Sequence, residues 1–330
     1  MRILVTGARG FVMSVFLKRL AEELPAANIL AVDISAPDEH LKRYLGSSGE
    51  RTRFRQLDVR NAEALVSLLA EEQPQVVVHG ATVTHVEEWE KQDPARYIDV
   101  NVMGTVHLME AVRRTPSVHR FLHVSSAAVY GSGEGLINPI PEDAATLPDE
   151  MYGISKVSAE LIVHRYGELF GIETPTVRFT KVFGAMERPS PGRSAMSLPF
   201  YAARALVQRR PLCLTSRTLQ ARGDWLSAID ITEAMVTLCC QEVTNSTTYN
   251  LASGTFVTVE ELLELFEVET EIHSLKTAEV DIDPSIASGK NGTFDIARAR
   301  SDLNWKPRTL KQQATEYSAW ARSHAGLFTA

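Results

Sequence analysis

The stretch Arg2-Ile3-Leu4-Val5-Thr6-Gly7-Ala8-Arg9-Gly10-Phe11 decides the fold, because a short apolar run ends there in closely spaced glycines. A helical pattern of apolar residues follows at once, from Val12 to about Leu24. After a buried strand and before a helix, Gly7 allows a tight turn and Gly10 lets a pyrophosphate approach the helix N-terminus. The stretch therefore predicts a dinucleotide-binding strand–turn–helix unit.

An acidic residue follows where such a unit needs one. The next apolar run ends in Asp33, about 20 residues beyond the glycines. A carboxylate there accepts hydrogen bonds from an adenosine ribose and repels a 2′-phosphate, which favours NAD over NADP. Arg9, inside the turn, opposes this preference because a cation can meet that phosphate, but we give Asp33 more weight. The acid also favours a cofactor site over a plain turn between strand and helix.

The third glycine of the dinucleotide motif is absent, and Met13 stands in its place. That glycine normally permits close packing of the helix on the strand. We therefore expect the first helix to be pushed outward or tilted.

Strand and helix patterns continue to alternate along the chain. Strands are expected over residues 54–59, 76–81, 121–126 and 176–179. Helices are expected over residues 62–72, 94–114 and from 152 onward. Repeated units of this length predict an α/β fold with a Rossmann-type, doubly wound parallel sheet, whose ligands bind at the carboxyl ends of the strands.

The second half of the chain is less regular. It begins with a loop rich in proline and glycine over 184–196, and a polar loop is expected over 281–291. Further elements are expected over residues 198–209, 231–240, 249–252, 259–266 and, as an N-capped helix, 295–303. We assign residues 1–180 to an NAD-binding domain, to which 224–252 return, and residues 181–330 to a smaller, interleaved C-terminal substrate lobe.

Composition limits the classes of function. The chain has 330 residues, of which 44% are apolar and 23% charged, as expected for a globular protein. A net charge of −7 argues against a nucleic-acid partner, and no apolar run is long enough for a membrane partner. Glycines follow the N-terminus too soon for a signal peptide. The cysteines and histidines show neither a disulfide framework nor metal spacing, so we expect a cytoplasmic protein without a metal.

Tyr152 and Lys156 stand four residues apart at the start of an expected helix, and therefore on one face of it. The ammonium favours the ionised phenol and should lower the pKa of Tyr152. Tyr152 could then accept a proton from an alcohol near neutral pH, which a phenol with a pKa of about 10 does poorly. This spacing also arises by chance on many helices, so the surrounding motifs decide its meaning.

Together these motifs resemble those of the extended short-chain dehydrogenase/reductases, specifically the NAD-dependent epimerase/dehydratase group, which acts largely on nucleotide sugars. The resemblance covers nearly the whole chain. It rests on Thr6-Gly7-x-x-Gly10-Phe11, Asp33, Asp58-Val59, His79-Gly80-Ala81, Asn101-x-x-Gly104-Thr105, Ser125-Ser126-x-x-Val129-Tyr130-Gly131, Tyr152-x-x-x-Lys156, Arg178-Phe179, Asp224-Trp225, Tyr249-Asn250 and Leu303-Asn304-Trp305-x-Pro307.

The resemblance implies a catalytic set of Ser126, Tyr152 and Lys156. Tyr152 would act as general base or acid on the reacting hydroxyl, and Lys156 would bind the nicotinamide ribose. Ser126 would hydrogen-bond the same substrate oxygen, while hydride passes to NAD. The expected cofactor-binding residues are Gly7, Arg9, Gly10, Phe11, Val12, Asp33, Asp58, Val59, Gly80, Ala81, Asn101, Tyr152, Lys156 and Phe179.

Three departures from the family pattern bear on the substrate. Ala127 and Ala128 stand where nucleotide-sugar 4,6-dehydratases carry the acidic pair that expels water, so we expect no dehydratase. Lys181 replaces a frequent asparagine and would meet a carboxylate or phosphate, unless it is a solvated surface lysine. Arg188 and Arg193 lie in the loop where relatives grip the substrate. They suit a diphosphate or a sugar acid, or else only keep the loop soluble.

Three functions remain open on this basis. The first is an NAD-dependent oxidoreductase or epimerase acting on a secondary hydroxyl of a sugar, with a nucleotide sugar as the expected substrate. The second is a net NAD-dependent dehydrogenase or reductase of a free sugar, a sugar acid or another small hydroxy compound. The third is a catalytically silent NAD sensor, against which the intact catalytic set argues. The resemblance also implies a homodimer through a four-helix bundle, with Leu108, Val112 and Leu161 as possible contacts.

Overall fold

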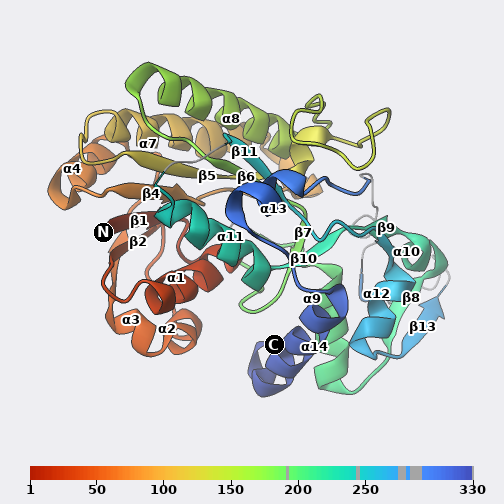
Figure 1. Ribbon diagram of the computed structural model, residues 1–330. Coiled ribbons are helices and arrows are strands. Elements are labelled where there is room, and N and C mark those ends of the chain that lie inside the picture. The colour runs from red at the N-terminus through yellow and green to blue at the C-terminus, as the bar shows by residue number, and fades with distance from the viewer. Residues whose placement is uncertain (191–192, 243–245, 274–279, 283–291, 329–330) are drawn as a thin grey trace.

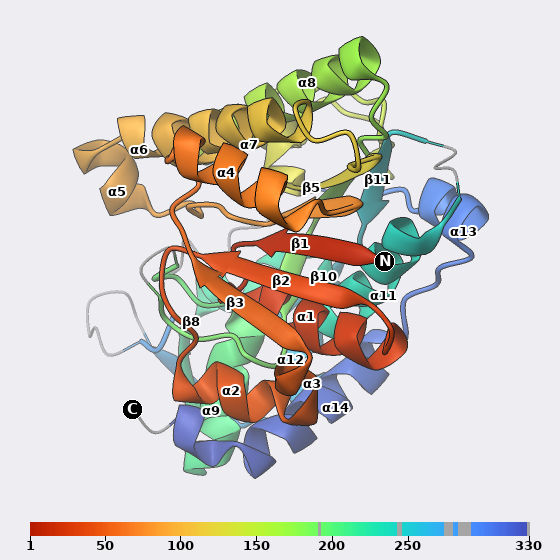
Figure 2. The same ribbon diagram turned by 90° about the vertical axis from the view of Figure 1, so that its left-hand side faces the viewer.

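The computed structural model describes residues 1–190, 193–242, 246–273, 280–282 and 292–328. A seven-stranded parallel sheet forms its centre, in the order β11-β6-β5-β4-β1-β2-β3 (Figures 1 and 2). Its strands are β1 (Arg2–Thr6), β2 (Asn28–Asp33), β3 (Thr52–Gln56), β4 (Val76–His79), β5 (Arg120–Ser126), β6 (Thr176–Phe179) and β11 (Thr248–Leu251). The strand order reverses at β1, which pairs with β2 and β4, and such a switch point creates a ligand-binding crevice. The predicted α/β, doubly wound fold is confirmed.

Helices cover both faces of the sheet (Figures 1 and 2). On one face, α1 (Phe11–Glu23) packs against α11 (Ala228–Cys240). The other face is covered by α4 (Ala62–Glu72), α7 (Gly104–Val112) and α8 (Met151–Phe170). The strands carry apolar side chains on both faces, so both faces must be covered. In β1, for example, Ile3 and Val5 belong to the core under α1, whereas Leu4 belongs to the core on the opposite face.

A second group of elements packs around its own core, at the lower right of Figure 1. It contains α9 (Leu198–Gln208), β8 (Leu212–Thr215), α10 (Ser216–Gln220), α12 (Val259–Phe266), β13 (Thr270–His273) and α14 (Leu310–Ser323). The rings of Phe183, Phe266 and Tyr317 meet there, with centroids 5.7 to 6.3 Å apart. Between these elements in the sequence come α11, which packs on the sheet, and β11, which is one of its strands, so the two groups are interleaved.

Short elements connect these layers. They are α2 (Glu39–Leu45), α3 (Ser47–Glu50), α5 (Glu87–Gln92), α6 (Ala95–Tyr97), η1 (Ile98–Met103), η2 (Ala127–Tyr130), β7 (Lys181–Phe183), β9 (Arg222–Gly223), β10 (Trp225–Ser227), β12 (Val257–Thr258), α13 (Ala297–Leu303) and η3 (Ala325–Leu327). In the part of the chain that the structure describes, no helix combines the length and apolar character needed to cross a bilayer.

Several expected boundaries differ from those observed. The helix predicted over residues 94–114 is observed as a continuous helical run from Ala95 to Val112, but its middle, η1, is π-helical and separates α6 from α7. The strand predicted over 54–59 spans 52–56 instead, and α14 was not predicted, although its Thr309–Gln312 capping box is a sequence signal. Most of the expected loop over 281–291 lies outside the described residues. The N-cap residue of α13 is Ile296, which makes no side-chain cap bond, so the expected N-cap is not observed, although the N–H of Ala297 donates to the carboxylate of Asp295.

Met13 packs directly over Gly80 at the end of β4. Its side chain is buried, and a Cβ built on Gly80 would lie only 2.5 Å from its Sδ and 2.6 Å from its Cγ. A third glycine on α1 would let the helix pack closely on the sheet; here Gly80 on the sheet side leaves the room that the Met13 side chain needs. This contact gives a physical reason for a glycine at residue 80 beside a methionine at residue 13.

We expect Gly80→Ala to lower the free energy of unfolding, because its methyl group would overlap the side chain of Met13. Overpacking of this kind typically costs about 1–3 kcal/mol. Urea unfolding followed by circular dichroism measures the loss. In a double-mutant cycle with Met13→Ala the two changes should couple, and simple additivity would contradict the contact.

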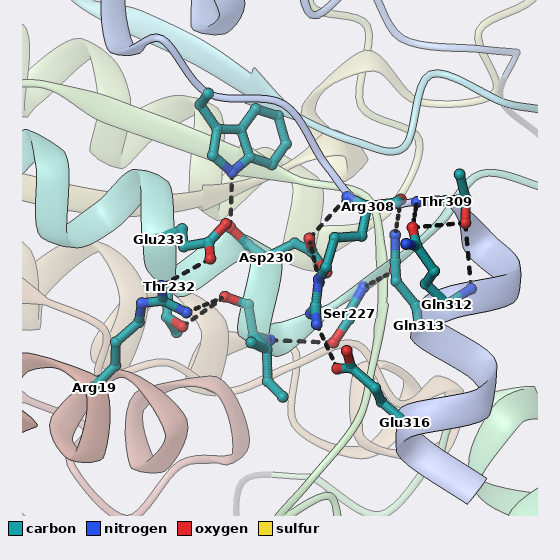
Figure 3. A network of polar contacts seen from close by, with 12 residues as sticks. Arg19, Ser227, Asp230, Thr232, Glu233, Arg308, Thr309, Gln312, Gln313 and Glu316 are labelled. Atoms are coloured by element: carbon teal, nitrogen blue, oxygen red, sulfur yellow. Dashed lines mark hydrogen bonds and ion pairs between the residues drawn. The ribbon is translucent and has the colours of Figure 1, made fainter.

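A buried polar network fastens the C-terminal segment to α11 (Figure 3). Asp230 on α11 has 0% exposure and accepts hydrogen bonds from Arg308, at 3.0 Å from Nε and 2.9 Å from Nη2. The carbonyl oxygen of Asp230 accepts the indole N–H of Trp305 at 2.9 Å. Gln313 on α14 accepts the N–H of Ser227 at 2.7 Å. These bonds join the smaller group of elements to a helix that packs on the sheet.

Candidate active site

A large cleft lies along the carboxyl ends of the sheet strands, with a volume of about 1470 Å³. Pockets for drug-sized ligands measure about 300–1,000 Å³, so this cleft has room for a dinucleotide and a second ligand. All the predicted site residues except Asn101 line it. They are Gly7, Arg9, Gly10, Phe11, Val12, Asp33, Asp58, Val59, Gly80, Ala81, Ser126, Tyr152, Lys156, Phe179, Lys181, Arg188 and Arg193.

The turn after β1 is shaped for close approach of a ligand. Gly7 has a φ of 67°, in the left-handed region that favours glycine. A Cβ there would lie 2.6 Å from the backbone of Gly80 and Ala81, so the ends of β1 and β4 touch. Gly10 is the N-cap residue of α1. The N–H groups and the dipole of this helix N-terminus suit a pyrophosphate.

Asp33 at the end of β2 is held against this turn. Its Oδ2 accepts the backbone N–H of Arg9 at 3.0 Å, and its Oδ1 accepts that of Ser35 at 3.1 Å. A carboxylate oxygen has a second lone pair, so Asp33 can still accept bonds from ribose hydroxyls. This arrangement fits NAD.

Asp38, the N-cap residue of α2, lies between two arginines. It is 2.8 Å from Arg9 Nη2 and 2.8 Å from Arg188 Nη2. Partial burial raises its pKa, but hydrogen bonds from the Leu41 N–H and from Arg9, with the charge of Arg188, lower it to about 2. The ionised carboxylate therefore neutralises Arg9, which removes the expected opposition of Arg9 to NAD. Arg188 reaches the same carboxylate from the 184–190 segment, and its contact with substrate stays a prediction.

The residues expected to act on the substrate converge where α8 meets β5. Lys156 Nζ lies 5.7 Å from the centre of the Tyr152 ring and donates to the carbonyl oxygen of Val124 at 2.9 Å. The hydroxyl of Ser126, at the end of β5, lies beside the Tyr152 phenol and lowers its pKa. A fixed ammonium, a phenol and a hydroxyl thus face the cleft together, as proton transfer from an alcohol requires.

Burial, and not Lys156, dominates the pKa of Tyr152. Removal from water raises this pKa to about 12; the neighbouring Ser126 and the charge of Arg193 lower it in part, while the charge of Glu150 raises it further. Burial also lowers the pKa of Lys156 to about 8, and the charge of Glu160 offsets only some of that shift. The prediction of a lowered Tyr152 pKa is therefore wrong for this structure, because desolvation of the phenolate outweighs the stabilising charges.

Asn101 has a structural role behind the cleft wall. Its Oδ1 accepts the N–H of Val83 at 2.8 Å, and its Nδ2 donates to the carbonyl oxygen of Val83 and to Ser155 Oγ. These bonds use the amide to tie the segment after β4 to α8. The family resemblance implies either a structural or a cofactor-side role for Asn101; its hydrogen bonds to protein groups favour the structural one, and a contact with the cofactor stays a prediction. Asn101 sits in the π-helical segment η1, and such segments often mark functional sites.

The model of the family described as NAD dependent epimerase/dehydratase matches residues 3–252. The chain belongs to this family. The match spans the sheet strands from β1 to β11 and includes the glycine turn, Asp33, Ser126, Tyr152 and Lys156. NAD is the family's cofactor, and the glycine turn and Asp33 are the residues expected to hold it.

Relatives within the NAD-dependent epimerase/dehydratase family differ in how much of their length the chain covers. A UDP-glucose 4-epimerase from Mycolicibacterium smegmatis is 27% identical, over 93% of this chain and 94% of that protein. A trifunctional UDP-glucose 4,6-dehydratase/epimerase/reductase from Arabidopsis thaliana is 32% identical over 57% of this chain. The match covers 28% of that protein and 56% of the Staphylococcus aureus protein CapI, so it spans only part of either relative.

Solved structures share the fold over almost the whole chain. A UDP-glucose 4-epimerase from Stenotrophomonas maltophila, with bound NAD and formylated UDP-arabinopyranose, superposes with a TM-score of 0.81 at 25% identity and 99% coverage of both chains. A UDP-glucose 4-epimerase from Thermotoga maritima gives a TM-score of 0.81 at 20% identity, covering 98% of this chain and 100% of that one. The second likeness shows the fold alone.

Two predicted substrate residues of this family member face the cleft as cations. Lys181 begins β7, and burial lowers its pKa while the charge of Glu150 raises it. Arg193 is paired with Glu187 at 2.5 Å and lies 5.6 Å from the centre of the Phe11 ring. Both line the cleft that contains Tyr152, so neither is a freely solvated surface cation.

The sequence motifs did not reveal a titratable cluster on the same cleft wall. Nδ1 of His85 lies 3.1 Å from an oxygen of Glu150 and 3.3 Å from an oxygen of Glu90. Glu90 also accepts the N–H of Met151 at 2.8 Å, which fixes its carboxylate at the start of α8. Glu150 stands two residues before Tyr152, and this proximity is the signal that could have revealed it.

Proposed function

We propose that the chain is an NAD-dependent oxidoreductase that acts on a secondary hydroxyl of a nucleotide-linked sugar, with epimerisation as its net reaction. The observation that carries this proposal is the convergence of Ser126, Tyr152 and Lys156 on a cleft with room for NAD and a second nucleotide-sized ligand. The nearly full-length likeness to a UDP-glucose 4-epimerase supports it.

Each group in this set has a definite task in the proposed reaction. Tyr152 takes the proton from the substrate hydroxyl, and Ser126 donates a hydrogen bond that steadies the substrate oxygen as it becomes a carbonyl. The ammonium of Lys156 is fixed by the carbonyl oxygen of Val124 and offsets the charge of the phenolate. Bound NAD supplies the acceptor for the hydride. For epimerisation, the keto-sugar must turn over before hydride and proton return.

Water elimination is not part of the proposed reaction. Ala127 and Ala128 both line the cleft, at positions where the resemblance places the acidic pair of nucleotide-sugar 4,6-dehydratases. Methyl groups neither donate nor accept a proton. A Cβ on Gly153 would come within 2.6 Å of the Ala128 carbonyl oxygen, so η2 and α8 are packed closely here.

NAD affinity is expected to fall above about pH 8 because Lys156, whose pKa burial lowers to about 8, loses its charge there. The sign follows from the lysine: the ammonium that would hold the nicotinamide ribose is present below this pKa and absent above it. If binding requires the ammonium, affinity falls by up to about tenfold per pH unit above pH 8. Titration of the protein with NAD from pH 7 to pH 10 measures this. Lys156→Met should remove the pH dependence, and an unchanged profile would contradict the assignment.

We propose Lys181 and Arg193 as the substrate-binding cations, suited to a diphosphate or a sugar acid. Arg188, by its pairing with Asp38, is better placed to hold the 184–190 segment over the coenzyme side. We also propose the division into an NAD-binding domain of residues 1–180, joined by 224–252, and a substrate lobe of residues 181–330. A cytoplasmic location remains part of the proposal.

We further propose a homodimer in which α7 and α8 pair with the same helices of a second copy. Leu108 and Val112 are core residues with 0% and 1% exposure, so they cannot form that contact. Exposed apolar side chains lie nearby instead, with Leu161 67% exposed, Ile154 40% exposed and Met103 39% exposed. Ile154 and Leu161 are seven residues apart and therefore share one face of α8.

Leu161→Glu is expected to convert the dimer into a monomer, because it places a charge in the centre of the proposed apolar contact. Sedimentation velocity measures the mass, and circular dichroism checks that the protein stays folded. Ile137→Glu, at an apolar residue that is 77% exposed but outside these helices, should leave the dimer intact. A dimer in the Leu161 variant would contradict the proposed interface.

A direct test separates epimerisation from the alternative, a net dehydrogenase or reductase of a free sugar, a sugar acid or another small hydroxy compound. Protein purified without added cofactor would be assayed for bound NAD and then incubated with UDP-sugars while NADH absorbance is followed. Retained NAD and an inverted sugar without net NADH support the proposal. Stoichiometric NADH would favour the alternative, and no reaction with any UDP-sugar would refute the proposed substrate class.

A further inference from the structure

Three metal-ligating side chains meet in the smaller group of elements, on the pair of strands β8 and β13. They are Cys213 on β8 and Glu271 and His273 on β13. The Cys213 Sγ, a Glu271 carboxylate oxygen and a His273 ring nitrogen all lie within 4.8 Å of one another. None of the three lines the cleft described above.

Strand pairing explains why these residues meet. β8 and β13 pair in parallel, and the register sets Glu271 opposite Cys213 and His273 opposite Thr215. Side chains alternate between the two faces of a strand, so residues 271 and 273 share a face. Leu212 and Leu214 point into the core with 0% exposure, which turns Cys213 toward the opposite face. Cys213 and His273 are too far apart in the sequence for a metal-binding spacing motif to reveal the cluster.

The surroundings of the cluster favour a bound cation. His273 Nε2 lies 3.3 Å from a Glu271 oxygen, yet among the described residues this buried nitrogen has no hydrogen-bond partner. A buried ring nitrogen without a partner is costly, and a metal ion would satisfy it.

The strand that carries the thiol is itself anchored. Asp281 accepts the backbone N–H of Cys213 at 3.0 Å and is paired with Arg210 at 2.6 Å and Arg204 at 3.1 Å. These bonds fix Cys213 in place and leave its side chain on the face shared with Glu271 and His273. A metal site requires ligands held in this way.

We propose that Cys213, Glu271 and His273 form a binding site for a divalent transition metal of the Zn²⁺ class. Thiolate and imidazole ligands select such ions, whereas Mg²⁺ and Ca²⁺ prefer oxygen ligands alone. Tetrahedral zinc sets its ligand atoms about 3.3–3.8 Å apart, so small side-chain rotations complete the geometry. Three protein ligands leave a fourth position open to water or to another ligand.

A metal ion at this site would crosslink β8 and β13, which pair only with each other among the residues that the structure describes. A two-stranded sheet is marginally stable by itself, and binding to the folded state alone stabilises that state by mass action. The bound metal would therefore stabilise the smaller group of elements. The site does not depend on the reaction proposed for the cleft.

Cobalt titration tests the site without reference to activity. Metal-free protein in reducing buffer would be titrated with Co²⁺, and the thiolate-to-cobalt charge-transfer band and the visible bands of tetrahedral Co²⁺ would be recorded. We expect one equivalent to bind and Zn²⁺ to displace it. Cys213→Ser should abolish the charge-transfer band, while Glu271→Gln and His273→Asn should each weaken binding by about tenfold or more.

A matched control is available on α11. Cys240 is exposed, whereas Cys213 is half-buried, and Cys240 lies outside the cluster, so Cys240→Ser should keep the charge-transfer band. Unchanged NAD binding would show that each variant is folded. Zn²⁺ should also raise the unfolding temperature of the wild type but not of His273→Asn, which tests the site even if Cys213→Ser does not fold. A wild type without the band, or a Cys240 variant that loses it, would refute the proposal.

Discussion

Tyr152→Phe is expected to reduce turnover by about 10²- to 10⁴-fold while the protein still binds NAD. The substitution removes only the phenolic oxygen that takes the proton from the substrate hydroxyl. The aromatic ring remains, and Lys156 keeps its bond to the carbonyl oxygen of Val124. Initial rates with the UDP-sugar substrate measure the first effect, and the NAD content of the purified variant measures the second.

Tyr166→Phe provides the matched control for that experiment. Tyr166 lies on the same helix, α8, but its hydroxyl donates to Glu110 at 2.8 Å and it does not line the cleft. Loss of this partly buried hydrogen bond should cost stability of about 1 kcal/mol and leave turnover near that of the wild type. Turnover in Tyr152→Phe above a tenth of the wild-type rate would mean that another group transfers the proton.

The half-buried position of Tyr152 in the cleft wall changes how this reaction must be understood. From the sequence alone, the lysine one turn away was expected to make the phenol acidic. In the structure the desolvation of the phenolate is larger, and the pKa of Tyr152 is raised to about 12. Ionisation of Tyr152 therefore depends on charges beside it, from Arg193 and from the oxidised nicotinamide when bound. Spacing shows which groups are neighbours, whereas burial decides which of their effects is larger.

The sheet and its ligand-binding edge were predictable because they depend on local patterns. Ile3, Leu4 and Val5 are apolar on both faces, as a strand in a parallel sheet must be, and the glycines after them fix the turn. Once β1 and α1 are set, each further strand–helix unit adds to the same sheet with its carboxyl end at the same edge. Asp33 and Ser126 therefore lie at the same edge of the sheet, although β1 and β4 separate their strands, and no long-range information is needed to predict this.

Other contacts depend on segments that only the folded chain brings together. Asp38 is joined to Arg188 although 150 residues separate them, and His85 reaches Glu150 across the cleft wall. Leu108 and Leu161 look equally suitable for an interface in the sequence, yet one is in the core and the other is 67% exposed. The sequence pattern cannot distinguish a buried from an exposed leucine here, because the segment that packs against each residue is known only in the folded chain.

Arg308→Ala is expected to lower the free energy of unfolding by about 3 kcal/mol. Asp230, its partner, has 0% exposure, and removing one member of a buried ion pair typically costs about 3–5 kcal/mol because the other charge remains buried. We expect the lower end of that range, because the Arg308 side chain is 28% exposed and water can enter its place. Urea unfolding followed by circular dichroism measures the change.

Lys306→Ala is the control for this prediction, since Lys306 is an exposed cation two residues away in the same segment. Its loss should change stability by no more than about 0.5 kcal/mol. The double variant Asp230→Asn, Arg308→Ala should regain part of the lost stability, because an uncharged amide costs less to bury than an unpaired carboxylate. If the double variant were as unstable as the sum of the two single changes, the loss would come from packing of the C-terminal segment. Recovery would instead show that the loss comes from the unpaired carboxylate of Asp230, which stays buried on α11 when Arg308 is removed.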